Sequence, residues 1–284
     1  RNTTAATTSP KDILAGAVVT ATEPVSLELI LGDDLNFGTR NVNILPAKFY
    51  GKTYYTPVPT VRTDGTAPAV VYFVNNNNSS ITVNWQSGIP TSGSINIPSN
   101  SWASLTLDAT NTGAYKFWNS AGKTFTALEI MDADATSSTY DWAITLIDSS
   151  RLTDFAGVAW APGSLDGSRN DGPVWVTPTA NTTIYVKFDG DMSDSTPTMS
   201  PCGMPFDVAY QVNALQYIKI KDPSDNDQSG MALYTCDGTT FTALYGQDAS
   251  TAVTAAPSLD VGTFLMPKCM RMQIIATDNY GTTA

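Results

Sequence analysis

The sequence predicts an all-β protein built from tandem β-sandwich units. Apolar and polar residues alternate with a period of two along most of the chain, and the alternating runs are rich in β-branched and aromatic residues. Gly, Pro, Asn and Asp bound these runs. One strand–turn–strand pattern also recurs along the chain, which indicates a duplicated structural unit.

The recurring pattern consists of a glycine, an apolar strand, a polar turn, a second strand and an acidic end. It occurs as GAVVTATEPVSLELILGD at 16–33, GAYKFWNSAGKTFTALEIMD at 113–132 and GMALYTCDGTTFTALYGQD at 230–248. The closest pair, FTALEIMDA at 125–133 and FTALYGQDA at 241–249, share six of nine residues at a spacing of 116. Composition alone is the alternative explanation, since Thr-rich alternating strands resemble one another.

Flanking segments repeat in the same order. VVYFVNNNNSSITVNW at 70–85 matches GPVWVTPTANTTIYVKF at 172–188, and AKFYGKTYYTPVP at 47–59 matches SRLTDFAGVAWAP at 150–162. The period of roughly 100 to 116 residues fits one sandwich, whereas a propeller would need two blades in each period. The predicted division is an extended segment 1–15, a first unit 16–112, a second unit 113–229 and a partial third unit 230–284.

The individual strands follow from alternation between turn residues, with spacings of about 8 to 14 residues. The expected strands are 26–31, 53–58, 70–74, 81–85, 94–97, 103–107, 114–118, 125–130, 142–147, 155–160, 174–177, 184–188, 217–221, 232–234, 241–245 and 271–276. One short helix is expected around 148–155, and it does not change the fold class.

Composition indicates the surface of a secreted protein. Charged residues make up 14% of the chain and the net charge is −11, which argues against nucleic acid as a partner. No apolar run reaches the roughly 18 residues that span a membrane, and the start RNTTAATTSP lacks the apolar core of a signal peptide. We expect an extracellular, cell-surface protein whose leader has been removed, or a piece of a longer protein.

The chain contains no histidine, so catalysis that needs an imidazole is not available to it. Glutamate occurs only at 23, 28 and 129. A glycosidase could still use two aspartates, and Asp132, Asp134 and Asp141 are the candidates. Aspartates are common in the turns that end strands, so no catalytic residue is predicted and the protein is expected not to be an enzyme.

Two acidic loops are candidate calcium sites. Asp222, Asp225 and Asp227 lie in DPSDNDQSG, and Asp189, Asp191 and Asp194 lie in DGDMSD. Calcium takes six to eight oxygen ligands, which closely spaced aspartates and turn carbonyls can supply. The equal alternative is a polar turn in which each Asp side chain bonds the local backbone.

Three cysteines and four glycosylation sequons complete the candidate sites. Cys202 and Cys236 are the favoured disulfide pair, which leaves Cys269 unpaired, and three free thiols are the alternative. The sequons are at Asn2, Asn77, Asn78 and Asn181. Six tryptophans keep a carbohydrate-binding role open, because sugars stack on exposed aromatic rings, although a core position is expected for most of them.

A family resemblance appears in four short runs that follow one another in order. TIYVKFDGD at 183–191, YIKIKDPSDNDQSG at 217–230, FTALYGQDAS at 241–250 and SLDVGTFLMP at 258–267 resemble a recurrent module of large bacterial surface proteins. The preceding runs ITVNW, SINIPSNSW and GAYKFW are similar to the amino-terminal domain of IgGFc-binding proteins. The resemblance implies an extracellular, all-β, non-catalytic surface module, without implying immunoglobulin binding.

The sequence therefore predicts a non-enzymatic extracellular structural or adhesive protein of a microbial cell surface. The expected partner is the chain itself, as a homo-oligomer or a filament built by β-strand addition, with surface glycans or host proteins as further candidates. In this hypothesis the partial unit 230–284 is completed by residues 1 to about 31 of the next subunit. A carbohydrate-binding surface module is the alternative.

Overall fold

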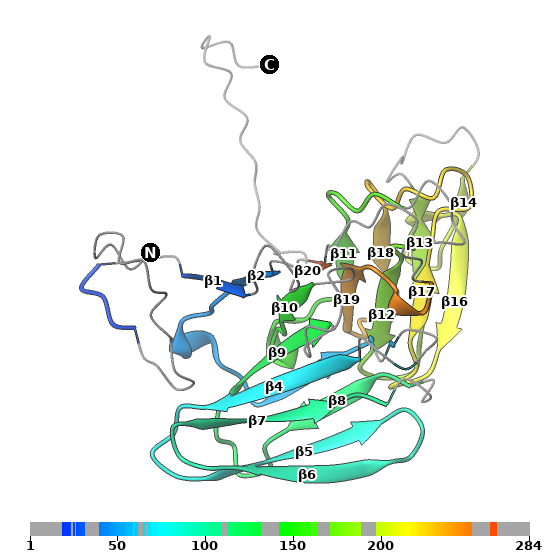
Figure 1. Ribbon diagram of the computed structural model, residues 1–284. Helices are drawn as coiled ribbons and strands as arrows, with labels where there is room; N and C mark the ends of the chain where they lie inside the picture. Colours follow the sequence, from blue (N-terminus) through cyan, green and yellow to red (C-terminus); the bar gives the residue numbers. More distant parts are fainter. Residues whose placement is uncertain are drawn as a thin grey trace, which may run out of the picture.

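The computed structural model shows an all-β protein whose strands form antiparallel sheets (Figure 1). It describes residues 19–23, 25, 27–31, 40–58, 60–61, 65, 68–108, 113–131, 142–163, 171–188, 197–251 and 262–265. The predicted sandwich fold is confirmed, and the propeller alternative is not, because two four-stranded sheets pack in each of two units and none closes into a barrel. No helix in the described ranges is long and apolar enough to cross a membrane.

The first sandwich consists of eight strands. One sheet has the order β3-β8-β5-β6, with bounds Thr53–Thr56, Tyr115–Trp118, Ile81–Ser87 and Ser92–Ile97. The other has the order β10-β9-β4-β7, with bounds Ala143–Thr145, Thr126–Met131, Ala69–Asn75 and Ser101–Thr106. In Figure 1 β4, β5, β6, β7 and β8 lie across the lower part of the view, and β9 and β10 lie nearer its centre.

The second sandwich repeats this arrangement. One sheet has the order β11-β18-β13-β16, with bounds Phe155–Gly157, Ala232–Tyr234, Thr182–Lys187 and Val208–Val212. The other has the order β20-β19-β12-β17, with bounds Gly262–Phe264, Phe241–Gly246, Val174–Pro178 and Ile218–Ile220. Counted along the chain without the separate β14–β15 pair, both sandwiches have the strand order 1-6-3-4 in one sheet and 8-7-2-5 in the other.

The folded units begin and end at different residues from the sequence repeat. β8 and β9, at 115–131, pair with β3, β5, β4 and β10, so they complete the first sandwich. β18 and β19, at 232–246, complete the second sandwich in the same way. The described part of 230–284 is thus not a partial third unit. A repeat fixes the period of a duplicated fold, but the long-range strand pairs fix where each unit starts.

A hairpin precedes the first sandwich. β1 (Glu28–Leu31) pairs with β2 (Arg40–Asn43) in a two-stranded sheet, in the same chain order as β9 with β10 and β19 with β20. Buried Val42 of this hairpin packs against Ile130 and Ala143 on the outer face of the first sandwich. The remaining short elements are β14 (Thr198–Met199), β15 (Pro205–Phe206), η1 (Ala47–Phe49), η2 (Ser149–Arg151) and η4 (Ala249–Thr251).

Burial along the strands shows which sheet faces are covered. Every residue of β12 and β19 is buried, so both faces of that part of the second sandwich are covered. On β7 the outward Trp102, Ser104 and Thr106 are exposed. The outer face of β12 and β19 is buried, unlike that of β7, because the first sandwich packs against it. Trp175 of β12 accordingly belongs to the hydrophobic cluster of the first sandwich. This junction joins the two cores.

One ionisable side chain lies inside the first core. Glu129 on β9 is fully buried, and the Thr56 hydroxyl donates to its Oε2, while Oε1 has no hydrogen-bond partner. Burial raises the pKa of Glu129 to about 8, against the opposing effect of the Thr56 hydrogen bond. The folded state therefore favours the neutral acid.

This burial predicts a stability that falls with rising pH. Because the folded-state pKa is raised to about 8 from an ordinary value of 4.5, the stabilisation is complete below pH 4.5 and is lost progressively up to about pH 8. Glu129→Gln should remove this dependence and be more stable than the wild type at pH 9, by a few kcal/mol at most.

Urea unfolding across pH 4 to 9 measures this effect. Glu28→Gln, at an exposed position of β1, is the matched control and should keep the wild-type profile. If Glu129→Gln and the wild type lose stability in parallel with rising pH, the carboxyl of Glu129 is not the source.

Candidate functional site

The loop at 222–229 holds its aspartates in separate local turns. Asp222 Oδ1 accepts from the Ser224 amide at 2.7 Å, Asp225 Oδ1 from the Asp227 amide at 2.9 Å, and Asp227 Oδ1 from the Ser229 amide at 2.8 Å. This is the geometry of the polar-turn alternative. Asp189, Asp191 and Asp194 lie outside the described residues. Within the described ranges, no three acidic, cysteine or histidine side chains gather as a metal site would require.

The sequons differ in accessibility. The side-chain nitrogen of Asn77, where a glycan would attach, donates to Asn75 Oδ1 at 2.7 Å and to the Thr124 carbonyl at 2.8 Å. Asn78 and Asn181 are exposed, and Asn181 accepts from the Ala214 amide at 2.8 Å. Asn2 lies outside the described residues. The geometry therefore favours Asn78 and Asn181 over Asn77 as acceptors.

A disulfide joins Cys202 to Cys236, the pair favoured from the sequence, with a Cα–Cα distance of 5.3 Å. It ties the loop between β14 and β15 to the turn between β18 and β19. Cys269 lies outside the described residues.

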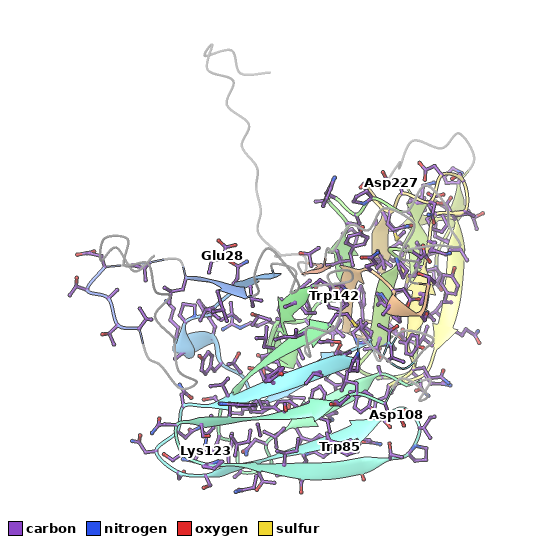
Figure 2. The ribbon with its side chains drawn as sticks, in the orientation of Figure 1. Glu28, Trp85, Asp108, Lys123, Trp142 and Asp227 are labelled. Carbon is purple, nitrogen blue, oxygen red and sulfur yellow. A yellow bond between two sulfur atoms is a disulfide. The ribbon has the colours of Figure 1, made fainter. Side chains whose placement is uncertain are left out.

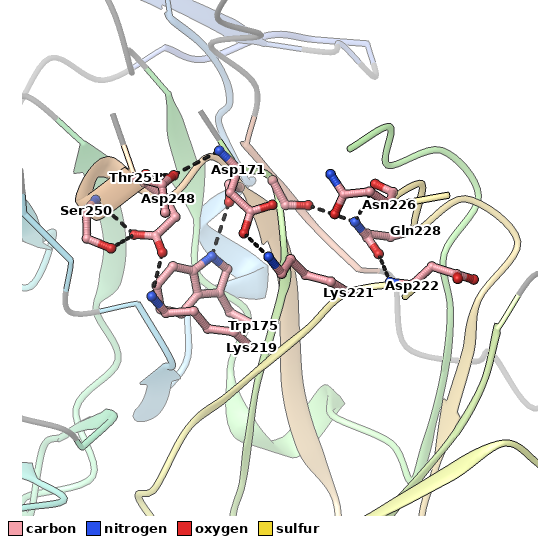
Figure 3. A network of polar contacts seen from close by, with 12 residues as sticks. Asp171, Trp175, Lys219, Lys221, Asp222, Asn226, Gln228, Asp248, Ser250 and Thr251 are labelled. Carbon is pink, nitrogen blue, oxygen red and sulfur yellow. Dashed lines mark hydrogen bonds and ion pairs between the residues drawn. The ribbon is translucent and has the colours of Figure 1, made fainter. Parts of the chain in front are cut away.

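A network of buried polar groups lies at the junction between the sandwiches, which sequence reasoning did not predict as a site (Figure 3). The close packing of the two units depends on this network and on two contacts beside it, a glycine pair and Trp142.

The first contact point is a pair of glycines in the first sandwich. Gly88 and Gly113 lie side by side, and a Cβ built on Gly88 would come within 2.0 Å of the Leu215 carbonyl oxygen and 2.6 Å of the Gly113 Cα. Leu215 belongs to the turn between β16 and β17, and its carbonyl accepts from the Ala114 amide at 2.7 Å. Only glycine permits so close an approach of two backbones.

Leu215 itself has a left-handed backbone conformation, with φ +60°. This conformation is uncommon for a bulky side chain, and it is kept where surrounding contacts compensate its cost. Here the side chain is buried with Tyr55 of β3 and with Leu152, which follows η2 after the first sandwich. The strained residue therefore sits where the two units meet.

The second contact point is Trp142, which precedes β10. The indole is 2% exposed and its Nε1 donates to the Gln247 carbonyl at 3.1 Å. A Cβ on Gly262 would lie 2.5 Å from the Trp142 ring, and one on Gly246 would lie 3.1 Å from it. The tryptophan thus packs over two glycines of the second sandwich, where no side chain blocks its ring. Figure 2 labels Trp142 near the centre of the view.

The third contact point is the fully buried carboxylate of Asp248. The Thr60 hydroxyl of the first sandwich donates to Oδ1 at 2.7 Å, and Lys219 Nζ lies 2.5 Å from Oδ2. The Ser250 amide and hydroxyl also donate to Oδ1, at 3.0 and 2.7 Å. Lys219 in turn lies over the ring of Trp175, 4.7 Å from its centroid (Figure 3). The charge is therefore paired and hydrogen-bonded, as a buried carboxylate requires.

A second ion pair lies beside this one. Asp171 is 3% exposed, its Oδ2 is 3.0 Å from Lys221 Nζ, and its carbonyl accepts from the Asp248 amide at 2.8 Å. Burial raises the pKa of Asp171, Lys221 lowers it, and the nearby Asp248 charge raises it. The two aspartates and two lysines balance in charge, and their contacts lock β12, β17 and the end of β19 together.

The sequence carried a signal for part of this junction. Asp248 is the acidic end of the repeated pattern FTALYGQDA, and its role as the acceptor from Thr60 explains why an acid stands there. The partner Thr60 is 188 residues away in sequence, so no local pattern could identify it.

A hollow of about 650 Å³ opens where β2, β10 and β20 meet. Val42, Ile144 and Phe264 are among its lining residues. Within the described ranges, β2, β10 and β20 are each an edge strand of their sheet. At the rim of this hollow the Thr145 hydroxyl donates a hydrogen bond to the Asn43 carbonyl at 2.6 Å.

The close contact at Gly88 predicts that a glycine-to-alanine substitution lowers the free energy of unfolding much more there than at an open position. Gly88→Ala should lower the free energy of unfolding by on the order of 3 kcal/mol, because the added Cβ meets backbone atoms that cannot move independently. Gly157→Ala is the matched control, since no atom lies within 4 Å of its added Cβ, and it should stay within about 1 kcal/mol of the wild type. Denaturant unfolding of both variants makes the comparison, and equal stabilities would contradict the close approach.

Comparison of the chain with known protein families, with characterised proteins and with solved structures gives no match.

Proposed function

We propose that this protein is a non-enzymatic extracellular structural or adhesive protein of a microbial cell surface, in which two β-sandwiches act as one rigid unit. The observation that carries the proposal is the junction: the chain uses two ion pairs with buried aspartates, close glycine contacts and two of its six tryptophans to fix one sandwich against the other. A fixed geometry of this kind suits a protein that transmits force or holds a ligand away from a surface.

The Cys202–Cys236 disulfide supports an extracellular location. Disulfides persist in oxidising compartments and are rare in reducing ones. The weakly charged, Thr- and Asn-rich composition agrees with this location, and so does the resemblance to surface modules of bacteria.

Counting thiols tests the compartment. Protein isolated from its native source with alkylation of free thiols at lysis should show one reactive thiol per chain in denaturant, that of Cys269. Prior reduction is the control and should give three. Three thiols without reduction would place the protein in a reducing compartment and contradict the proposed location.

A carbohydrate-binding module is the second candidate, and one observation favours it. Of the six tryptophans, Trp142 and Trp175 are buried, but Trp102 is 45% exposed and Trp160 is 60% exposed. Trp102 also lies beside Tyr72, with ring centroids 5.6 Å apart. An exposed tryptophan backed by a half-buried tyrosine can stack against a sugar ring.

A further inference from the structure

The Tyr72–Trp102 pair has a counterpart in the second sandwich. Tyr72 pairs with Leu128 across β4 and β9, and Trp175 pairs with Leu244 across β12 and β19. The two leucines are the same residue of the repeated run FTAL, so Tyr72 and Trp175 occupy equivalent positions. On the other side, Tyr72 pairs with Ser104 and Trp175 with Lys219.

The equivalence extends to the neighbouring aromatic residue and to the turn before it. Two residues before Ser104 and Lys219 stand Trp102 and Tyr217, and their rings lie 5.6 Å from Tyr72 and 5.4 Å from Trp175, respectively. Two residues further back, Asn100 and Leu215 both have left-handed backbones, with φ +51° and +60°. The same aromatic pair and the same turn are therefore present on the outer face of both sandwiches.

The two faces differ in what covers them. In the second sandwich, Trp175 is fully buried under the first sandwich, and Leu215 contacts Gly88 and Gly113. In the first sandwich, the cluster under the β1–β2 hairpin covers the β9–β10 half and reaches the half-buried Tyr72, whereas Trp102 and Asn100 are exposed. The face around Trp175 is thus an interface in the second sandwich, whereas the equivalent face of the first sandwich leaves Trp102 exposed.

The second sandwich carries the complementary end. The first sandwich covers its neighbour with the segment after β3, which holds Thr60, and with Gly113 before β8. In the second sandwich the segment after β11 holds Trp160, which is 60% exposed, and the glycine before β18 is Gly230, which is exposed. Gly113 and Gly230 begin the same repeated pattern, but the Gly230 amide donates to the Val158 carbonyl within the second sandwich, so this end would bind through its side chains and not through that amide.

We propose that the Tyr72–Trp102 face of one copy of this chain binds the Trp160–Gly230 end of the second sandwich of another copy. The occupant is a second copy because, within the chain, the topologically equivalent end of the first sandwich binds the equivalent face of the second. Exposed tryptophans are the residues that most often contribute strongly to an interface. The contact joins two different surfaces, so each copy offers one free face and one free end, and the copies form an open chain.

This inference deepens the proposed structural function, because it names the partner through which a rigid unit would extend into a filament. It replaces completion of a partial third unit as the route of assembly. The two proposals fail separately: a monomeric protein would overturn the self-association face and leave the location and the rigid sandwich pair untouched.

Complementary variants test the proposal on the full chain. Sedimentation velocity of the wild type should show a mass that grows with concentration, whereas Trp102→Glu and Trp160→Glu should each sediment as monomers. An equimolar mixture of the two variants should give a heterodimer and nothing larger, because one intact face and one intact end remain between them. The exposure of both side chains means that neither change should alter the melting temperature by more than about 1 °C.

The control is Ile89→Glu, which places the same charge on another exposed apolar side chain, in the turn at the opposite end of β6 from Trp102. It should assemble as the wild type does. A wild type that stays monomeric at all concentrations, or a mixture that stays monomeric, overturns the proposal. Loss of glycan-array binding in Trp102→Glu without any change in mass would also overturn it and would assign the face to a sugar.

Discussion

The close approach of the two sandwiches is the constraint on which the rest of this structure depends. The Leu215 carbonyl reaches the Ala114 amide only because Gly88 and Gly113 carry no side chains there, and Trp142 reaches the second sandwich only over Gly246 and Gly262. Both contacts need bare backbone on one side. Between them, the two glycine pairs fix the second sandwich at two separated points, which removes the freedom to pivot that one contact would leave.

The polar groups of the junction follow from this closeness. Once the sandwiches approach so tightly, Asp248 is removed from water and its charge must be compensated within the protein. Lys219 supplies the opposite charge, and Thr60 and Ser250 donate hydrogen bonds. Glu129 in the first core has no such cation and is held as the neutral acid instead. The two buried acids show two ways of meeting the same cost: a partner of opposite charge, or a raised pKa.

Much of the fold was predictable from the sequence, and the junction was not. Alternation predicted the strands, and the repeated FTAL run predicted the duplication, because both are local signals. The residues at which each unit begins and ends were not predictable, since β8 pairs with β3 and β9 with β4, which lie many residues earlier in the chain. The acidic turn at 222–229 was recognised, but alternation cannot tell whether an aspartate bonds its own turn or a metal. The burial of Trp175 depends on another sandwich altogether.

The central claim is that the two sandwiches move as one body, and an inter-sandwich distance measures this most directly. Spin labels on cysteines introduced at Asn96 of β6 and Gln211 of β16, both exposed, report that distance by pulsed electron resonance in a chain with Cys269→Ser and the Cys202–Cys236 disulfide intact. A single narrow distance distribution is the expected result. A broad or two-component distribution would show a hinge at the junction and contradict the account.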